Sequence, residues 1–309
     1  MKAKAVLTAA IVSAACLFSS CGDNLIPAEN NFSRMFSADG DKSVFVSVNL
    51  LDVDNETTTV KLGGELSSYS DKLVSALTSA KLSENPDPYD LPAPDSMLLQ
   101  IEILRNDSET ERGMDLCHME LFNDGTLGVF GTKQFCGEGK SYALSVNDMN
   151  EIIYAAELIS DNRTSCPQPM RITDPLSSFS ASGAMVAPAG RTWHSGVPDG
   201  EDSARPLDGQ DSNGKVELYS SNIMLDFPAG FEPDSIEIIG WDPSPSGAII
   251  YNPKYEYENS FSSAEDFTGM FQAESNTVYM VTVTYDILNY DERGFYGSAD
   301  YHFETGDLN

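Results

Sequence analysis

Residues 116–132 constrain the fold more than any other stretch, because two alternating apolar–polar runs there flank an Asp124-Gly125 pair. Asp-Gly favours a two-residue hairpin turn, since both residues of that turn type adopt positive φ. The period of two in the flanking runs predicts two antiparallel strands. With Asp124-Gly125 as the loop, Met119 lies opposite Phe130. This register predicts a buried face made of Cys117, Met119, Leu121 and Phe130.

The surrounding residues 43–160 carry further strand and helix signals. Apolar residues at three- and four-residue spacing predict helices over about 67–82 and from Met149 to Ile159, the second after a capping-box-like Ser145. Strands are predicted at 43–51, 57–62, 97–104 and 140–146. Residues 43–160 are therefore expected to form an α+β domain with an antiparallel sheet and two helices.

The next segment, residues 161–214, is rich in Pro, Ser, Gly and Asp and shows no sustained periodicity. We expect a linker or long irregular connection there, in which 185–187 or Trp193 could still add a strand. From residue 215 to 309 the signals are all-β, with strands expected at 216–218, 223–227, 235–241, 248–251, 277–287 and 296–305. Strands at this spacing predict a β-sandwich.

The alternating runs at 278–283 and 297–303 resemble the closing hairpin of immunoglobulin-like modules in bacterial extracytoplasmic proteins. The resemblance covers residues 215–309 and implies an immunoglobulin-like β-sandwich. It implies a fold and no activity.

The first 20 residues predict a secretory signal peptide. Lys2 and Lys4 precede an apolar run from Ala5 to Phe18, which is too short to span a membrane. The following Ser-Ser-Cys-Gly resembles the lipobox of bacterial lipoproteins, with Phe18 where a leucine is usual. The resemblance implies that Cys21 carries lipid, such as palmitate, and begins the mature chain. Residues 21–42 are expected to be a flexible tether.

The chain is strongly acidic, with 48 Asp and Glu against 18 Lys and Arg and a formal net charge of −30. This charge argues against nucleic acid as a partner, because phosphates are neutralised by Lys and Arg. It also argues against electrostatic docking on anionic lipids. Solubility is the simplest role of the charge, and binding of Ca²⁺ or a cationic partner is the alternative. Oxygen-rich segments that could hold Ca²⁺ are 52–56, 199–202 and 208–214.

Residue types that usually carry chemistry are few. Besides Cys16 and Cys21, three cysteines (Cys117, Cys136 and Cys166) leave the disulfide state open, since an odd number cannot all pair within one chain. The three histidines (His118, His194 and His302) are expected at the surface. Gly137–Ser141 resembles a P-loop only superficially, because it precedes a strand. We therefore expect no catalytic, cofactor-binding or metal-ligating residue, and Cys21 is the one functional residue predicted.

These observations favour a lipid-anchored lipoprotein outside the cytoplasm, on the cell membrane or outer membrane, that binds an extracellular protein or glycan without catalysis. One alternative is an anchored hydrolase of glycan or cell wall that uses paired carboxylates. Another is a structural subunit of an envelope assembly, which would present an exposed strand edge in the terminal sandwich.

Overall fold

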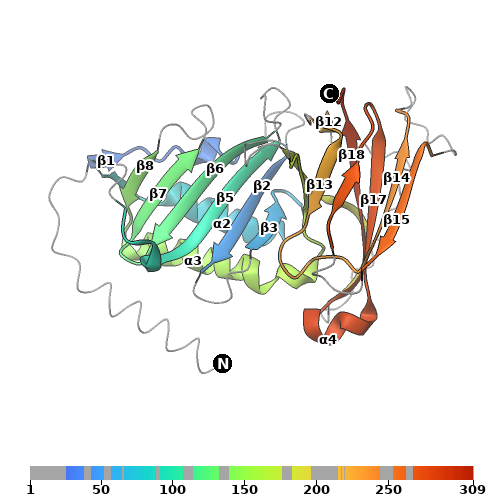
Figure 1. The fold of residues 1–309 in the computed structure, drawn as a ribbon. Coiled ribbons are helices and arrows are strands. Elements are labelled where there is room, and N and C mark those ends of the chain that lie inside the picture. Colours follow the sequence, from blue (N-terminus) through green and yellow to red (C-terminus); the bar gives the residue numbers. More distant parts are fainter. Residues whose placement is uncertain are drawn as a thin grey trace.

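The computed structural model describes the chain in segments, and the account below covers these alone: residues 26–37, 43–51, 57–64, 66–85, 87, 91–106, 114–131, 139–175, 183–195, 215–216, 218, 220–243, 253–261 and 267–308. Over them the protein is mostly β, with sheets of eight, four and six strands (Figure 1). The strand pairs are antiparallel except for β12 (Lys215–Val216), which runs parallel to β18 (Tyr296–Thr305). None of the described helices is long and apolar enough to cross a membrane.

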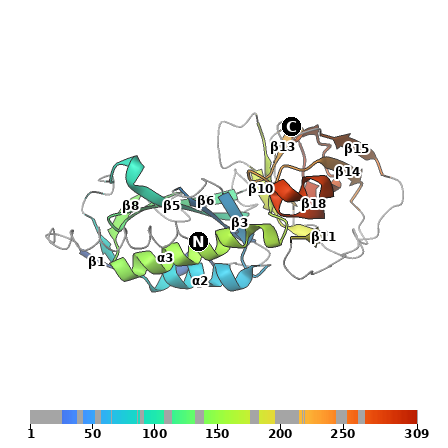
Figure 2. The ribbon, with the colours of Figure 1, turned by 90° about the horizontal axis from the view of Figure 1, so that it is seen from below.

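The eight-stranded sheet, called here the large sheet, belongs to the N-terminal half of the chain. Its order is β1 (Ile26–Ala28), β4 (Leu82–Glu84), β8 (Lys140–Ala143), β7 (Thr126–Gly131), β6 (Met114–Phe122), β5 (Met97–Asn106), β2 (Val44–Leu50) and β3 (Thr57–Lys61). Helices α2 (Ser67–Ser79) and α3 (Val146–Asp161) pack side by side on one face of this sheet, as Figure 2 shows from below. The six strands and two helices predicted within 43–160 are present, and short β4 and a 3₁₀ turn at Pro94–Ser96 add to them.

Alternating strand residues and the inner stripes of both helices form one core. Ile101 and Met119 of the sheet and Leu73 and Ile152 of the helices are fully buried in it. Ser145 caps α3 as its sequence predicts, because its hydroxyl accepts a hydrogen bond from the Asp148 N–H at 3.2 Å. Apolar side chains on one face of the large sheet thus pack against the helices. No described helix covers the opposite face, which is called here the helix-free face.

The predicted hairpin forms, but its register differs by one residue from the expectation. Met119 lies opposite Val129, not Phe130, and the loop has three residues. The Gly125 N–H donates to the Phe122 carbonyl, and Gly125 has φ of +88°, so one left-handed glycine closes a longer turn. Phe130 consequently lies on the helix-free face and is partly exposed, whereas Cys117, Met119 and Leu121 are buried as expected.

The expected tether is wrong for residues 26–37. β1 pairs with β4, and Phe32 and Met35 are buried in the core of the large sheet. The Asn30 side chain donates to the carbonyls of Leu77 and Ala80, both at 2.8 Å, and so closes the C-terminal end of α2. Two apolar side chains within this polar stretch thus pack the segment onto the core of the large sheet, although they show no periodicity in the sequence.

The expectation of an irregular connection over 161–214 is wrong for three strands within it: β9 (Met170–Thr173), β10 (Gly183–Val186) and β11 (Pro188–His194). β9 and β10 join β13 (Asn222–Asp226) and β16 (Met270–Gln272) in the four-stranded sheet. The six-stranded sheet has the order β11, β18, β17 (Val278–Tyr285), β14 (Ser235–Trp241) and β15 (Tyr255–Ser260), and β12 pairs with β18 at its side.

One apolar core lies between these two sheets. Met170 and Ile172 face it from the four-stranded sheet and Val281 and Phe303 from the six-stranded one. Trp193 of β11 is buried there, stacked 4.7 Å from Phe295, and its indole N–H donates to the Thr164 carbonyl at 2.9 Å. Strands of four to seven residues between prolines and glycines are too short to produce a sustained pattern. β9 was therefore missed, whereas β10 and β11 include residues 185–186 and Trp193, where an added strand was left open.

The large sheet contacts the C-terminal half through a small junction. Phe45 and Leu104 of the large sheet pack against Met185 and Ala187. The Asn106 amide donates to the Met185 carbonyl at 2.7 Å and accepts from the Met185 N–H at 3.0 Å. These contacts fix one end of the helix-free face beside β10.

Candidate binding surfaces

A row of polar side chains crosses the helix-free face of the large sheet. Thr59, Ser47, Glu102 and His118 lie in successive cross-strand register on β3, β2, β5 and β6. The hydroxyl groups of Ser47 and Thr59 are 2.7 Å apart and buried. Each of these residues alternates with a helix-facing apolar residue, so the period of two that built the core also built this row.

The exposed end of the polar row is a carboxylate–imidazole–carboxylate group. His118 Nδ1 lies 3.7 Å from Glu102 and Nε2 lies 3.2 Å from Glu120. The neighbouring Glu102 carboxylate, with smaller help from Glu120, raises the pKa of His118 against the opposing effect of burial. The His118 imidazole, with smaller help from the positive charge of Arg171, lowers the pKa of Glu102 against the opposing effect of burial. Acid and base thus stabilise each other's charged forms on an open surface.

The other end of the row is closed by the C-terminal half. The Thr59 N–H donates to the Gln168 side chain at 2.9 Å, and the Gln168 amide nitrogen donates to the Arg163 carbonyl. The Gln168 carbonyl in turn accepts from the buried Tyr301 hydroxyl at 2.7 Å. The polar row is therefore a surface bounded at the junction and open towards β6 and β7.

A second surface is the outer strand of the six-stranded sheet. β15 has the sequence Tyr-Glu-Tyr-Glu-Asn-Ser, and within the described residues it pairs with β14 alone. Tyr255 and Tyr257 pack against the core, and Glu256 and Glu258 are exposed. An unpaired strand edge offers backbone N–H and C=O groups to another extended chain.

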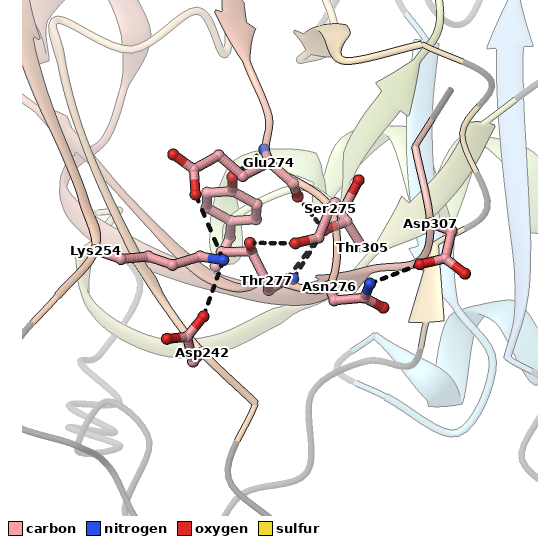
Figure 3. A network of polar contacts seen from close by, with 9 residues as sticks. Asp242, Lys254, Glu274, Ser275, Asn276, Thr277, Thr305 and Asp307 are labelled. Atoms are coloured by element: carbon pink, nitrogen blue, oxygen red, sulfur yellow. Dashed lines mark hydrogen bonds and ion pairs between the residues drawn. The ribbon is translucent and has the colours of Figure 1, made fainter.

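A polar network fixes the start of β15 to the neighbouring turns (Figure 3). Lys254, the residue before β15, extends between Asp242 and Glu274, with Nζ–O distances of 3.0 and 3.4 Å. Burial alone would lower the pKa of Lys254, but the hydrogen bonds to Asp242 and Glu274 outweigh it and raise that pKa. The Glu274 N–H donates to the Tyr279 hydroxyl at 2.6 Å.

The same network holds the end of the chain. The Thr305 hydroxyl donates to the Glu274 carbonyl at 2.6 Å, and the Asn276 amide donates to Asp307 at 2.7 Å. Asn276 adopts a left-handed φ of +49°, which asparagine tolerates better than most residues. Strand β15, the turn before β17 and the tail after β18 are thus held as one unit.

The three histidines have different surroundings. His118 is partly exposed, as expected, and His194 of β11 stacks on Tyr296 with ring centroids 4.6 Å apart. His302 was expected at the surface and is 1 % exposed, and among the described residues neither of its ring nitrogens has a hydrogen-bond partner. Burial lowers the pKa of His302. Its position in β18 was predicted correctly, but alternation along one strand does not reveal what covers the outer face.

Several predicted features lie outside the described residues. These are Cys21, the signal segment, Cys136, the oxygen-rich segments 52–56, 199–202 and 208–214, and the strand at 248–251. Cys117 and Cys166 are both buried. Lys140 begins strand β8, as expected from the argument that the glycine-containing segment leads into a strand and therefore only superficially resembles a P-loop. Within the described ranges, no three His, Cys, Asp or Glu side chains are grouped closely enough to hold a metal ion.

Comparison with protein-family models, curated proteins and solved structures finds no match. The surfaces are therefore interpreted from their own chemistry. The polar row was missed because it depends on the pairing of four strands. β15 could have been found, since its Tyr-Glu-Tyr-Glu alternation is a half-buried strand pattern.

Proposed function

We propose that this chain is a lipid-anchored lipoprotein outside the cytoplasm that binds a partner and does not catalyse a reaction. The observation that carries the proposal is the N-terminal sequence, in which a basic start and an apolar run lead to Ser-Ser-Cys21-Gly. Lipid on Cys21 would then attach the protein to the cell membrane or outer membrane, and at least two acyl chains make such an anchor stable.

The start of the described fold supports a close attachment. Ile26 already belongs to β1, so four residues separate it from Cys21. The five Cα–Cα steps from Cys21 to Ile26 span at most about 18 Å. Lipid on Cys21 would therefore hold the β1 end of the large sheet near the membrane, whereas β14 and β15 lie at the opposite end of the molecule (Figure 1).

The two surfaces support a binding role. The pKa values of His118 and Glu102 shift because these two side chains pair with each other on the helix-free face of the large sheet. The β15 edge offers backbone groups together with carboxylates. An extracellular protein or a glycan is the kind of ligand that such surfaces fit, and the net charge of −30 disfavours nucleic acid.

We also propose an α+β domain over 43–160, here including 26–37, and an immunoglobulin-like sandwich for the C-terminal half. The strand order β18-β17-β14-β15 opposite β13-β16 supports the sandwich, as does the parallel pairing of β12 with β18. The bond to the Tyr279 hydroxyl from the Glu274 N–H resembles the tyrosine corner of that fold. Strands β9 to β11 would belong to this sandwich.

The anchor is tested by fractionating native cells that express the wild type, Cys21→Ala or the matched control Cys16→Ala. We expect the wild type and the Cys16→Ala variant in the membrane fraction, labelled by a clickable fatty acid. Cys21→Ala should be unlabelled, and most of it should be released or mislocalised. Membrane-bound, labelled Cys21→Ala protein would contradict the proposal.

The binding role is tested by crosslinking on intact cells followed by purification of the wild-type protein and of Cys21→Ala. A partner captured by the wild type and reduced with Cys21→Ala is expected. Turnover of a glycan or cell-wall substrate by the purified protein would instead favour the hydrolase alternative.

A further inference from the structure

Within the described residues, strand β15 is the outermost strand of the six-stranded sheet, at the end of the molecule opposite β1 (Figure 1). Its six residues pair with β14 in one continuous register, from Ser235 opposite Ser260 to Gly240 opposite Tyr255. The core holds the strand through Tyr255 and Tyr257, and the Lys254 network holds its start. These contacts hold the strand in place against β14 and the core.

The hydrogen-bond phase of the ladder shows which backbone groups face outward. The Phe261 N–H donates to the Asp234 carbonyl at 2.7 Å, and these two residues continue the β14–β15 register. In an antiparallel pair, hydrogen-bonded residues alternate along the strand. Odd-numbered residues of β15 therefore bond to β14, and the even-numbered residues direct their N–H and C=O groups away from the sheet.

Two residues supply the open part of this edge. At Ser260 the N–H is already bonded to the Asn259 side chain at 3.0 Å, so the edge is closed there. Glu256 and Glu258 keep outward N–H groups, and no proline interrupts the strand between residues 255 and 260. Their backbone groups are spaced to pair with one further extended chain.

The negative charge on this edge determines which kind of partner strand can pair with β15. Glu256 and Glu258 are exposed, and Glu237 of β14, also exposed, lies directly opposite Glu258. Like charges in direct cross-strand register are destabilising. A second copy paired edge to edge would add two more carboxylates, whereas a strand with Lys or Arg would place positive charge beside the existing ones.

We propose that the β15 edge binds an extended, lysine- or arginine-rich segment of a partner protein as a seventh strand, through the backbone of Glu256 and Glu258 and the carboxylates of Glu237, Glu256 and Glu258. This inference deepens the proposed binding role and rests on it. It names a basic strand as the partner, and it gives the edge at the end opposite β1 as the docking surface.

The test uses full-length protein in mild detergent and a ten-residue peptide of alternating lysine and valine. Two control peptides have the same length: one carries glutamate in place of lysine, and the other keeps its side chains but has methylated backbone nitrogens at its central residues, which removes their N–H groups. We expect the lysine peptide to bind, with amide exchange slowed at Glu256 and Glu258. The acidic and N-methylated peptides should bind at least tenfold more weakly.

Two protein variants separate strand addition from general charge attraction. Glu258→Pro removes one outward N–H without removing a bond to β14, so its fold should persist and binding should weaken at least tenfold. Glu256→Lys/Glu258→Lys should lose the lysine peptide and bind the acidic one. The control Asp291→Lys/Glu292→Lys makes the same charge change on exposed residues of helix α4 (Tyr290–Arg293) and should bind like the wild type.

Equal binding of the lysine and N-methylated peptides, or loss of binding in the α4 control, would overturn the inference, because the attraction would then be diffuse. No binding by well-folded wild type, checked by its thermal melt, would overturn it too. Such failure leaves the proposed function standing if surface crosslinking still captures a partner through another face. If Glu258→Pro captured the same partner as the wild type in equal amount, the partner would be bound through a face other than the β15 edge.

Discussion

At the residue scale, His118 and His302 show how one residue type takes opposite electrostatic roles. His118 lies partly exposed between two carboxylates, and its raised pKa follows from the neighbouring Glu102 carboxylate first and from Glu120 second. His302 has both ring nitrogens buried without a hydrogen-bond partner, and burial lowers its pKa. Both lie in strands with polar neighbours in sequence, so the local pattern does not distinguish them.

His302→Phe should change how stability depends on pH. The pKa of His302 is lower in the folded than in the unfolded protein, so the wild type loses stability as the pH falls from about 6.5 through the folded pKa. The phenylalanine variant should lose that part of the dependence. Urea denaturation at pH 7.5, 6.5 and 5.5 measures the free energy of unfolding of both proteins. The same change of this free energy with pH in the wild type and the variant would contradict the burial argument.

His118→Gln is the matched control for this experiment, because its effect has the opposite sign. The raised pKa of His118 contributes stability that is present below pH 6.5 and lost as the pH rises through the folded pKa. His118→Gln should therefore destabilise the protein more at pH 5.5 than at pH 7.5.

At the element scale, Asp234 joins the loop after β17 and helix α4 to the start of β14. Its carboxylate forms a two-pronged ion pair with Arg293 at 2.8 and 3.1 Å. It also accepts from the Asp286 N–H at 2.6 Å and from the Asn289 amide at 2.9 Å. Both partners of the ion pair are largely buried, so one side chain organises a whole connection.

Asp234→Ala should lower the free energy of unfolding by about 3 kcal/mol, since it leaves Arg293 largely buried without its partner. The comparison is Glu84→Gln, which breaks the exposed ion pair of Glu84 with Lys140 at 3.1 Å and should cost less than about 1 kcal/mol. Chemical denaturation of both variants measures the difference. Equal losses of unfolding free energy in the two variants would show that burial does not determine how much these ion pairs contribute to stability.

At the scale of the whole molecule, a small junction couples the two halves. Phe45, Leu104, Met185 and Ala187 form its apolar part, and the side chains of Asn106 and Gln168 form its polar part. Gln168 is bonded on three sides, to Thr59, Arg163 and Tyr301. The junction also determines where the polar row of the large sheet ends.

Asn106→Ala/Gln168→Ala should uncouple the halves, because it removes hydrogen bonds that cross the junction while leaving both cores intact. Each such bond contributes about 1 kcal/mol. Calorimetry should show unfolding transitions that lie further apart than in the wild type. An exposed control, Asp95→Asn, should leave the profile unchanged. An unaltered profile in the double variant would mean that the apolar contacts alone provide the coupling.

Most of the large sheet and its helices could be predicted, because these segments are long enough for their periodicity to be visible. The α3 cap at Ser145 is a local signal and was predicted correctly. The hairpin register was predicted one residue away, since the choice between a two- and a three-residue loop depends on how Gly125 closes the turn. Residues 26–37 and strand β9 were missed, and β10 and β11 were left open only at 185–187 and Trp193, because the burial of these segments depends on partners distant in sequence.

By itself the sequence determined the β-rich class of the fold, the place of the two packed helices and the acidity that limits the partners. Those properties depend on local spacing and on charge, which need no tertiary partner. Only the tertiary structure decided that Phe32 and Trp193 are core residues, that His302 is buried, and that Glu102 meets His118. It also decided which backbone groups of β15 face outward, because an edge is defined by the absence of a neighbouring strand in the described sheet.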